Sequence, residues 1–234
     1  MNENKNEDMD FDFGGGADFN PENIEVEETI NAVFVLDKYS SMGNRVGNST
    51  RIDELNSAVN IFVEEMSKSH LSDRLLVSTV VFDHEIEVLT GFQPITEVEE
   101  FRLTPGGMTA LYGAARVGLD KAIDYRDNLI KSGIKAKTVL FLVTDGENVN
   151  SPDSDADYVK AKLEELNKEE QNIMTFSAVL LGIGDDGEFK KSFDKLGFHG
   201  LAEVGDDIRK VINILSSSVT SVSNGQNVSQ KINF

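Results

Sequence analysis

Short apolar runs alternate with amphipathic segments along most of the chain. Four runs are apolar on consecutive positions, as in parallel strands buried on both faces, at residues 31–37, 75–82, 138–145 and 174–183. Five segments place apolar side chains at helical spacing, at residues 52–66, 109–131, 157–170, 189–196 and 208–215. A weaker run at 85–92 predicts a strand at the sheet edge. This alternation predicts an α/β fold: a mostly parallel central sheet, helices on both faces and one antiparallel edge strand.

The two ends of the chain lack this pattern. Residues 1–28 are acidic, rich in Asn and interrupted by three glycines, so they cannot bury enough apolar surface to offset their ordering entropy. Residues 218–234 are polar, and we expect them to fray. The sequence therefore predicts one folded domain, residues 29–217, between an acidic arm and a polar tail.

Aromatic residues alternate with acids in the arm, at Phe11, Phe13 and Phe19. Such alternation is typical of short docking motifs, and a passive solvated tail is the alternative interpretation.

Composition excludes several classes of function. The formal net charge of -19 argues against nucleic acid and against anionic membrane surfaces as partners, since both attract clustered Lys and Arg. The chain has no cysteine, which excludes disulfides, Cys-ligated zinc and thiol catalysis. The N-terminus lacks the basic and apolar regions of a signal peptide, and no run of about 18 apolar residues exists, so we expect a cytoplasmic protein.

Oxygen-bearing side chains follow the predicted strands at positions where ligands bind in open α/β sheets. Asp37 and Ser41 follow the first strand, Thr109 stands at a helix start behind a glycine turn, and Asp145 closes the strand in LFLVTDGE. Each has an ordinary explanation alone, as a cap or turn residue. Together, hard oxygen ligands from separate parts of the chain suit Mg²⁺ or Mn²⁺.

With these residues in this order, the chain resembles a von Willebrand factor A (vWA) domain, which has a Rossmann-like fold. That family carries a metal-ion-dependent adhesion site (MIDAS) made of Asp-x-Ser-x-Ser, a distant Thr and a later Asp. The surrounding segments VFVLD, GGMTALYGA and VLFLVTDGEN also resemble the family, over about residues 31–217. The ending ILSSSVTSVS is similar to bacterial vWA proteins associated with tellurium resistance.

The resemblance implies roles for individual residues. It implies that the metal ligands are Asp37, Ser41, Thr109 and Asp145. Three glycines are expected to shape the loops of this site: Gly106, Gly107 and Gly146. Further candidates for a metal contact or for the rim of the site are Tyr39, Ser40 and Met108.

Tyr39 departs from the family pattern, which has a serine at this position. A phenol is too long to replace that short hydroxyl, and it is a modest ligand when neutral. Three outcomes stay open: Tyr39 turns outward and water fills the position, Ser40 contributes instead, or the ring occupies the metal position and the site is dead. Mg²⁺ tolerates the first outcome because it keeps several waters.

Two other motifs have structural explanations. GIGDDG at 182–187 matches a nucleotide-binding fingerprint, but its two aspartates would face a pyrophosphate. DSDADYVKAKLE at 153–164 begins like a calcium loop, yet Tyr158 stands where the loop requires Gly, and an acidic helix start explains it better. The three histidines lie outside the motifs of the proposed metal site.

The function expected from the resemblance is a non-enzymatic protein–protein interaction module. In that family one metal position is left open, and a Glu or Asp of a protein partner fills it. One alternative is a metal-independent vWA scaffold with a degenerate site. The other is a Mg²⁺-dependent hydrolase, which would need a proton-transfer partner that the motifs do not supply.

Overall fold

The computed structural model describes residues 27–146, 148–168, 175–184, 187, 189–205 and 208–226. Six strands form one sheet in the order β5-β4-β1-β6-β7-β8. Their bounds are β1 Glu28–Asp37, β4 Leu75–Phe82, β5 Ile86–Pro94, β6 Lys135–Thr144, β7 Phe176–Ile183 and β8 Gly200–Gly205. All neighbours are parallel except β4 and β5. The predicted fold class and its antiparallel edge strand are therefore confirmed.

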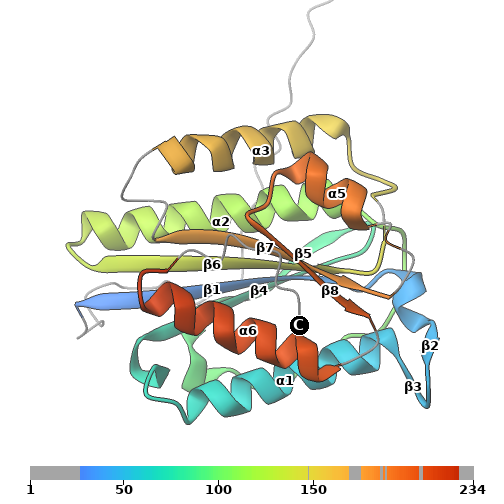
Figure 1. Ribbon diagram of the computed structural model, residues 1–234, viewed down its shortest axis with the longest axis horizontal. Helices are drawn as coiled ribbons and strands as arrows, with labels where there is room; N and C mark the ends of the chain where they lie inside the picture. Colours follow the sequence, from blue (N-terminus) through green and yellow to red (C-terminus); the bar gives the residue numbers. More distant parts are fainter. Residues whose placement is uncertain are drawn as a thin grey trace, which may run out of the picture.

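Helices cover both faces of the sheet (Figure 1). One face carries α1 (Arg51–Ser67) and α6 (Ile208–Ser223). The other carries α2 (Leu111–Lys131), α3 (Asp153–Lys168) and α5 (Phe189–Leu196).

Strand β1 runs through the middle of the molecule, which explains its unbroken apolar sequence. Phe34 and Leu36 belong to the core under α1 and α6, whereas Val33 and Val35 belong to the core under α2. Successive side chains of a strand point to opposite faces, so both faces of β1 must be apolar.

Local signals set the helix starts. Thr50 caps α1: its hydroxyl oxygen accepts the amide hydrogen of Asp53 at 3.3 Å, and the same hydroxyl donates to the Asp53 carboxylate at 2.7 Å. Helix α3 begins at Asp153 and has Asp153 and Asp155 in its first turn, where carboxylates complement the helix dipole. The helical interpretation of residues 153–164 is confirmed.

The structure also contains elements that the sequence pattern did not predict. Strand β8 pairs with β7 at the sheet edge, and a small hairpin joins β2 (Arg45–Val46) to β3 (Ser49–Thr50). Strand β8 and the hairpin strands are too short to show a hydrophobic period in the sequence. Helix α6 runs past residue 217 because Val219 and Val222 are buried, so the expected tail begins inside a packed helix.

Several expectations fall on residues outside those described. These are the docking motif at Phe11, Phe13 and Phe19 and the two aspartates of GIGDDG. Within the described ranges, no helix is both long enough and apolar enough to cross a membrane.

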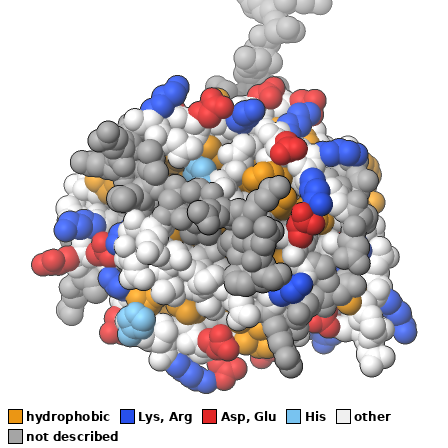
Figure 2. All heavy atoms as spheres, viewed as in Figure 1, with side chains coloured by type: hydrophobic (Ala, Val, Ile, Leu, Met, Phe, Trp, Pro, Cys, Tyr) orange, Lys and Arg blue, Asp and Glu red, His pale blue; other side chains and the backbone are white. Residues whose placement is uncertain are grey.

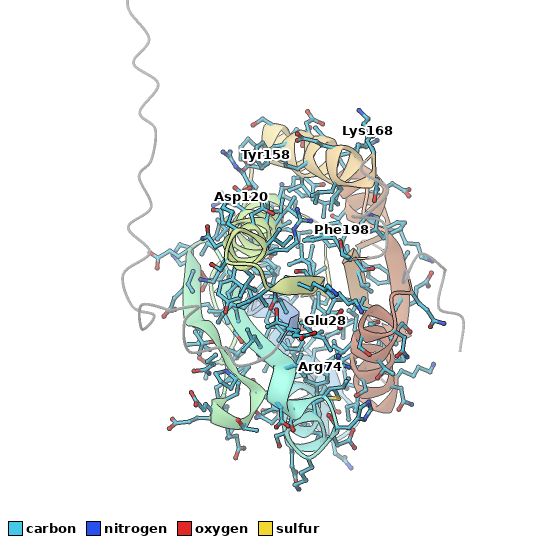
Figure 3. The ribbon with its side chains drawn as sticks, turned by 90° about the vertical axis from the view of Figure 1, so that its left-hand side faces the viewer. Glu28, Arg74, Asp120, Tyr158, Lys168 and Phe198 are labelled. Atoms are coloured by element: carbon cyan, nitrogen blue, oxygen red, sulfur yellow. The ribbon has the colours of Figure 1, made fainter. Side chains whose placement is uncertain are left out.

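The amino ends of the strands are tied by charge pairs at the end of the sheet shown in Figure 3. Glu28 at the start of β1 pairs with Arg74 at 3.1 Å and with Lys137 of β6 at 3.1 Å. On the α2–α3 side of the same view, the Tyr158 hydroxyl donates to Asp120 at 2.8 Å. The two partly exposed ion pairs of Glu28 each contribute roughly 0.2–1 kcal/mol. The opposite end of the sheet carries the polar cluster.

Candidate metal and docking site

Three loops meet beyond the carboxyl ends of the strands, at the right of Figure 1, where the chain leaves β1, enters α2 and leaves β6. The Gly106 amide, in the loop before α2, donates to the Lys38 carbonyl after β1 at 2.7 Å. The Ser41 hydroxyl donates to Asp145 Oδ1 at 2.8 Å, which joins the loops after β1 and β6. Predicted site residues separated by more than a hundred positions are thus brought into contact.

Asp37 is fully buried at the end of β1 and accepts two hydrogen bonds. One comes from the Tyr39 amide at 2.8 Å and the other from the Thr144 hydroxyl at 2.7 Å. Burial raises the pKa of Asp37 to about 7; the nearby charges of Asp145 and Asp83 act in the same direction, and the two hydrogen bonds oppose it. Since a carboxylate has about four lone-pair sites, each oxygen can still accept a further partner.

Thr109 is 1% exposed, and its backbone joins the loop before α2 to the loop after β6. Its carbonyl accepts the amide hydrogens of Val149 at 3.1 Å and Asn150 at 2.9 Å. Helix α2 begins one residue later than an N-cap at Thr109 would require: Ala110 is the N-cap. The amide hydrogens of Tyr112 and Gly113 in the first turn of α2 are accepted by the side chains of Asn148 and Ser151. The Thr109 side chain is therefore not the cap of this helix, which leaves its hydroxyl available as a ligand.

Arg51, the first residue of α1, also contacts the cluster. Its Nη1 lies 2.8 Å from Asp145 Oδ2, and the Asp145 side chain is fully buried. The backbone amide of Arg51 donates to the Asn44 carbonyl at 3.1 Å, which fixes the helix start against the loop containing Ser41. The motif pattern did not point to Arg51, because the motif consists of oxygen ligands and an arginine has none in its side chain.

A second charged group borders the site at the end of β4. Asp83 pairs with Lys38 at 3.3 Å and with His84 Nδ1 at 3.1 Å. Hydrogen bonds from the Glu85 amide and from Lys38 outweigh burial and lower the pKa of Asp83. The strand-end rule could have found this pair, because Phe82 is the register partner of Asp37.

The rim combines polar and apolar side chains. Met108 is 47% exposed and Val149 is 57% exposed, in two loops whose backbones are hydrogen-bonded to each other. Tyr39 is half-buried and Ser40 is exposed; Tyr39 precedes the short 3-10 helix η2 (Ser40–Gly43), which contains Ser41.

Of the three predicted loop-shaping glycines, the structure requires one. Gly107 has φ +67°, and a Cβ there would lie 2.5 Å from His84 Nδ1 and 2.8 Å from Asp83 Cβ. A Cβ at Gly106 or Gly146 would meet no atom within 4 Å.

The donor set fits a small divalent cation. It contains two carboxylates, a Ser41 hydroxyl whose proton already points to Asp145, and the hydroxyl of the buried Thr109. Such oxygen ligands, completed by water, match what Mg²⁺ and Mn²⁺ require. Across the described ranges no three acidic or histidine side chains gather, so a carboxylate-rich metal cluster is not present there. The guanidinium of Arg51 is a feature that opposes a cation.

A separate hollow of about 660 Å³ lies between α1 and the segment at residues 95–102. Its lining includes Asn56, Asn60 and Phe101 and none of the proposed ligands. The oxygen cluster is thus an edge site formed by loops, distinct from this hollow.

Neither a family model nor a curated protein matches the sequence. Solved structures are similar in fold. The PilB minor pilin from Streptococcus sanguinis matches with a TM-score of 0.58 at 15% identity, over 85% of this chain and 62% of its own. Proximal thread matrix protein 1 from the mussel byssus matches with a TM-score of 0.53 at 16% identity, over 83% of this chain and 46% of its own.

A serine-substituted aerotolerance-related membrane protein from Bacteroides fragilis matches with a TM-score of 0.53 at 11% identity, over 82% of this chain and 99% of its own. At these identities the likeness shows the fold: a Rossmann-like, vWA-type α/β domain. The chain spans less than two thirds of the pilin and of the byssus protein.

Proposed function

We propose that this chain is a vWA-type protein-interaction module without catalytic activity, anchored by a divalent cation. Asp37, Ser41, Thr109 and Asp145 would hold Mg²⁺ or Mn²⁺, with water in the position that Tyr39 does not fill. The open position of the ion would bind a Glu or Asp side chain of a protein partner. The observation that carries the proposal is the junction of three distant loops around oxygen donors, with Ser41 bonded to Asp145 and the Thr109 side chain not used as the helix cap.

The rim supports a protein partner. Met108 and Val149 present apolar surface beside a polar centre, which is the anatomy of interfaces where a few apolar anchors surround one directional contact. The pilin and byssus matrix protein among the structural neighbours support the same class of function.

Charge narrows the partner's chemistry. The net charge of -19 repels an acidic surface at long range, so the anchoring carboxylate should lie within a mixed or basic surface. On the face shown in Figure 2, Lys and Arg side chains are interspersed with Asp and Glu.

A second candidate function is a metal-independent docking surface on the same fold. The Arg51–Asp145 ion pair favours it, because the guanidinium already neutralises one of the two proposed metal carboxylates. The partner could then contact the rim without an ion.

Calorimetry of the chelator-treated protein separates these candidates. Titration with Mg²⁺ and with Mn²⁺ should give saturable heat and raise the melting temperature. Thr109→Ala should abolish both signals, whereas Thr104→Ala, at an exposed threonine nearby, should leave them unchanged. No heat and no thermal shift with either ion would refute the metal-anchored function and leave the metal-independent surface.

A further inference from the structure

Arg51 is built into the site rather than resting on its surface. Its Nη1 bonds Asp145 at 2.8 Å, its side chain is 15% exposed, and its backbone is tied to the loop after β1. Its Nε is buried and has no partner among the residues that the structure describes. Among the described residues, the guanidinium makes one ion pair, with Asp145, and this contact opposes the cost of its desolvation.

Gly184, at the end of β7, makes room for this side chain. A Cβ at Gly184 would lie 2.4 Å from Arg51 Nη2 and 2.9 Å from Arg51 Cζ. The φ of Gly184 is +90°, a conformation that favours glycine. Two distant chain segments thus combine to hold a fixed positive charge beside Asp145.

A fixed cation changes what the oxygen cluster can bind. It offsets the charge of Asp145 and repels a second cation placed beside the same carboxylate. Because the pair is largely buried, solvent and salt screen this repulsion only weakly.

We propose that Arg51 is the affinity-setting residue of this site: a resident cation that positions Asp145 and holds the affinity for the divalent ion well below that of the same oxygen donors alone. The inference rests on the proposed metal site. Arg51 acts through Asp145 and is not itself a ligand.

The test uses Mn²⁺ alone, titrated into the chelator-treated full chain by calorimetry. Arg51→Gln removes the charge but keeps a hydrogen-bond donor, and Arg51→Lys keeps the charge. Arg102→Gln is the matched control: it changes the net charge equally at a side chain that is 79% exposed and pairs with Asp53 at 3.2 Å. We expect Arg51→Gln to bind Mn²⁺ at least about tenfold more tightly than Arg102→Gln, and Arg51→Lys to bind like wild type.

Melting temperatures give a second readout. Without metal, Arg51→Gln should melt below Arg102→Gln, because Asp145 stays buried without its cation. With Mn²⁺ its melting temperature should rise more than that of the control. If Arg51→Gln is unfolded in chelator, folding on addition of Mn²⁺ supports the inference, and failure to fold at concentrations that saturate wild type overturns it.

The outcomes separate the two proposals. Equal or weaker Mn²⁺ binding by Arg51→Gln relative to Arg102→Gln overturns the role of Arg51, while heat that is lost in Thr109→Ala keeps the metal site. Binding by Arg51→Gln but not by wild type supports Arg51 and overturns metal anchoring in the natural chain. No binding in any variant overturns both.

Discussion

Replacing the buried carboxylate of Asp37 by an amide should stabilise the metal-free protein. Asp37→Asn keeps an acceptor for the Tyr39 amide and can pair with the Thr144 hydroxyl once that hydroxyl rotates. It removes a charge that lies in the protein interior. Buried carboxylates are costly unless a cation compensates them, and the proposed cation is removed by the chelator.

The size of the gain follows from the pKa of Asp37, which is about 7 in the folded protein against 3.8 for an aspartate exposed to water. Each unit corresponds to about 1.4 kcal/mol, so ionisation of Asp37 costs on the order of 4 kcal/mol at pH 8. Because the folded pKa is raised, the cost is fully present above pH 7 and disappears as the pH falls towards the unfolded value. Allowing for altered hydrogen bonds, we expect a gain of about 2–4 kcal/mol at pH 8.

The assay is urea unfolding followed by circular dichroism, in chelator, at pH 8 and pH 5. The gain at pH 5 should be about half of that at pH 8 or less. Asp73→Asn, at an exposed aspartate, is the control and should change the unfolding free energy little at either pH. A variant that is no more stable than wild type at pH 8, or a gain of equal size at both pH values, would refute the reasoning. The same variant should lose Mn²⁺ binding, since stability and ligation make opposite demands on this residue.

Three further predictions concern the loops and the last helix. Tyr39→Ser should tighten Mn²⁺ binding several-fold in calorimetry, by restoring a short hydroxyl ligand; unchanged or weaker affinity would mean that Tyr39 takes part in coordination. Gly107→Ala should lower the free energy of unfolding by about 2–3 kcal/mol, because it adds a clash with Asp83 to a strained φ. The control Gly133→Ala, at φ +84° in open space, should lower it by about 1 kcal/mol. Equal losses of the two variants in urea melts would contradict this prediction. Val219→Ala should cost about 2 kcal/mol in the same melts, and a negligible effect would show that α6 is not packed beyond residue 217.

The fold class followed from the sequence because hydrophobic period reports which face each element buries. Strand β4 has the predicted bounds of 75–82, and the long apolar strands are central ones that must be apolar on both faces. Strand β8 lies at an edge and is six residues long, so its identity depends on pairing with β7 and not on its own pattern. Helix α6 extends beyond its predicted end because the side chains of Val219 and Val222 are buried in the core, although the segment around them is rich in serine.

The candidate site, like the fold, was predictable only in part from the sequence. The sequence by itself determined that Asp37, Ser41, Thr109 and Asp145 belong to loops at one edge, since the carboxyl ends of parallel strands share an edge and the motif gives their order. Only the tertiary structure decided that Arg51 reaches Asp145. The direction of a long side chain depends on the space around it, and here that space is left by Gly184, which follows strand β7. Hydrophobic period carries no information about such contacts, because they arise between segments that only packing brings together.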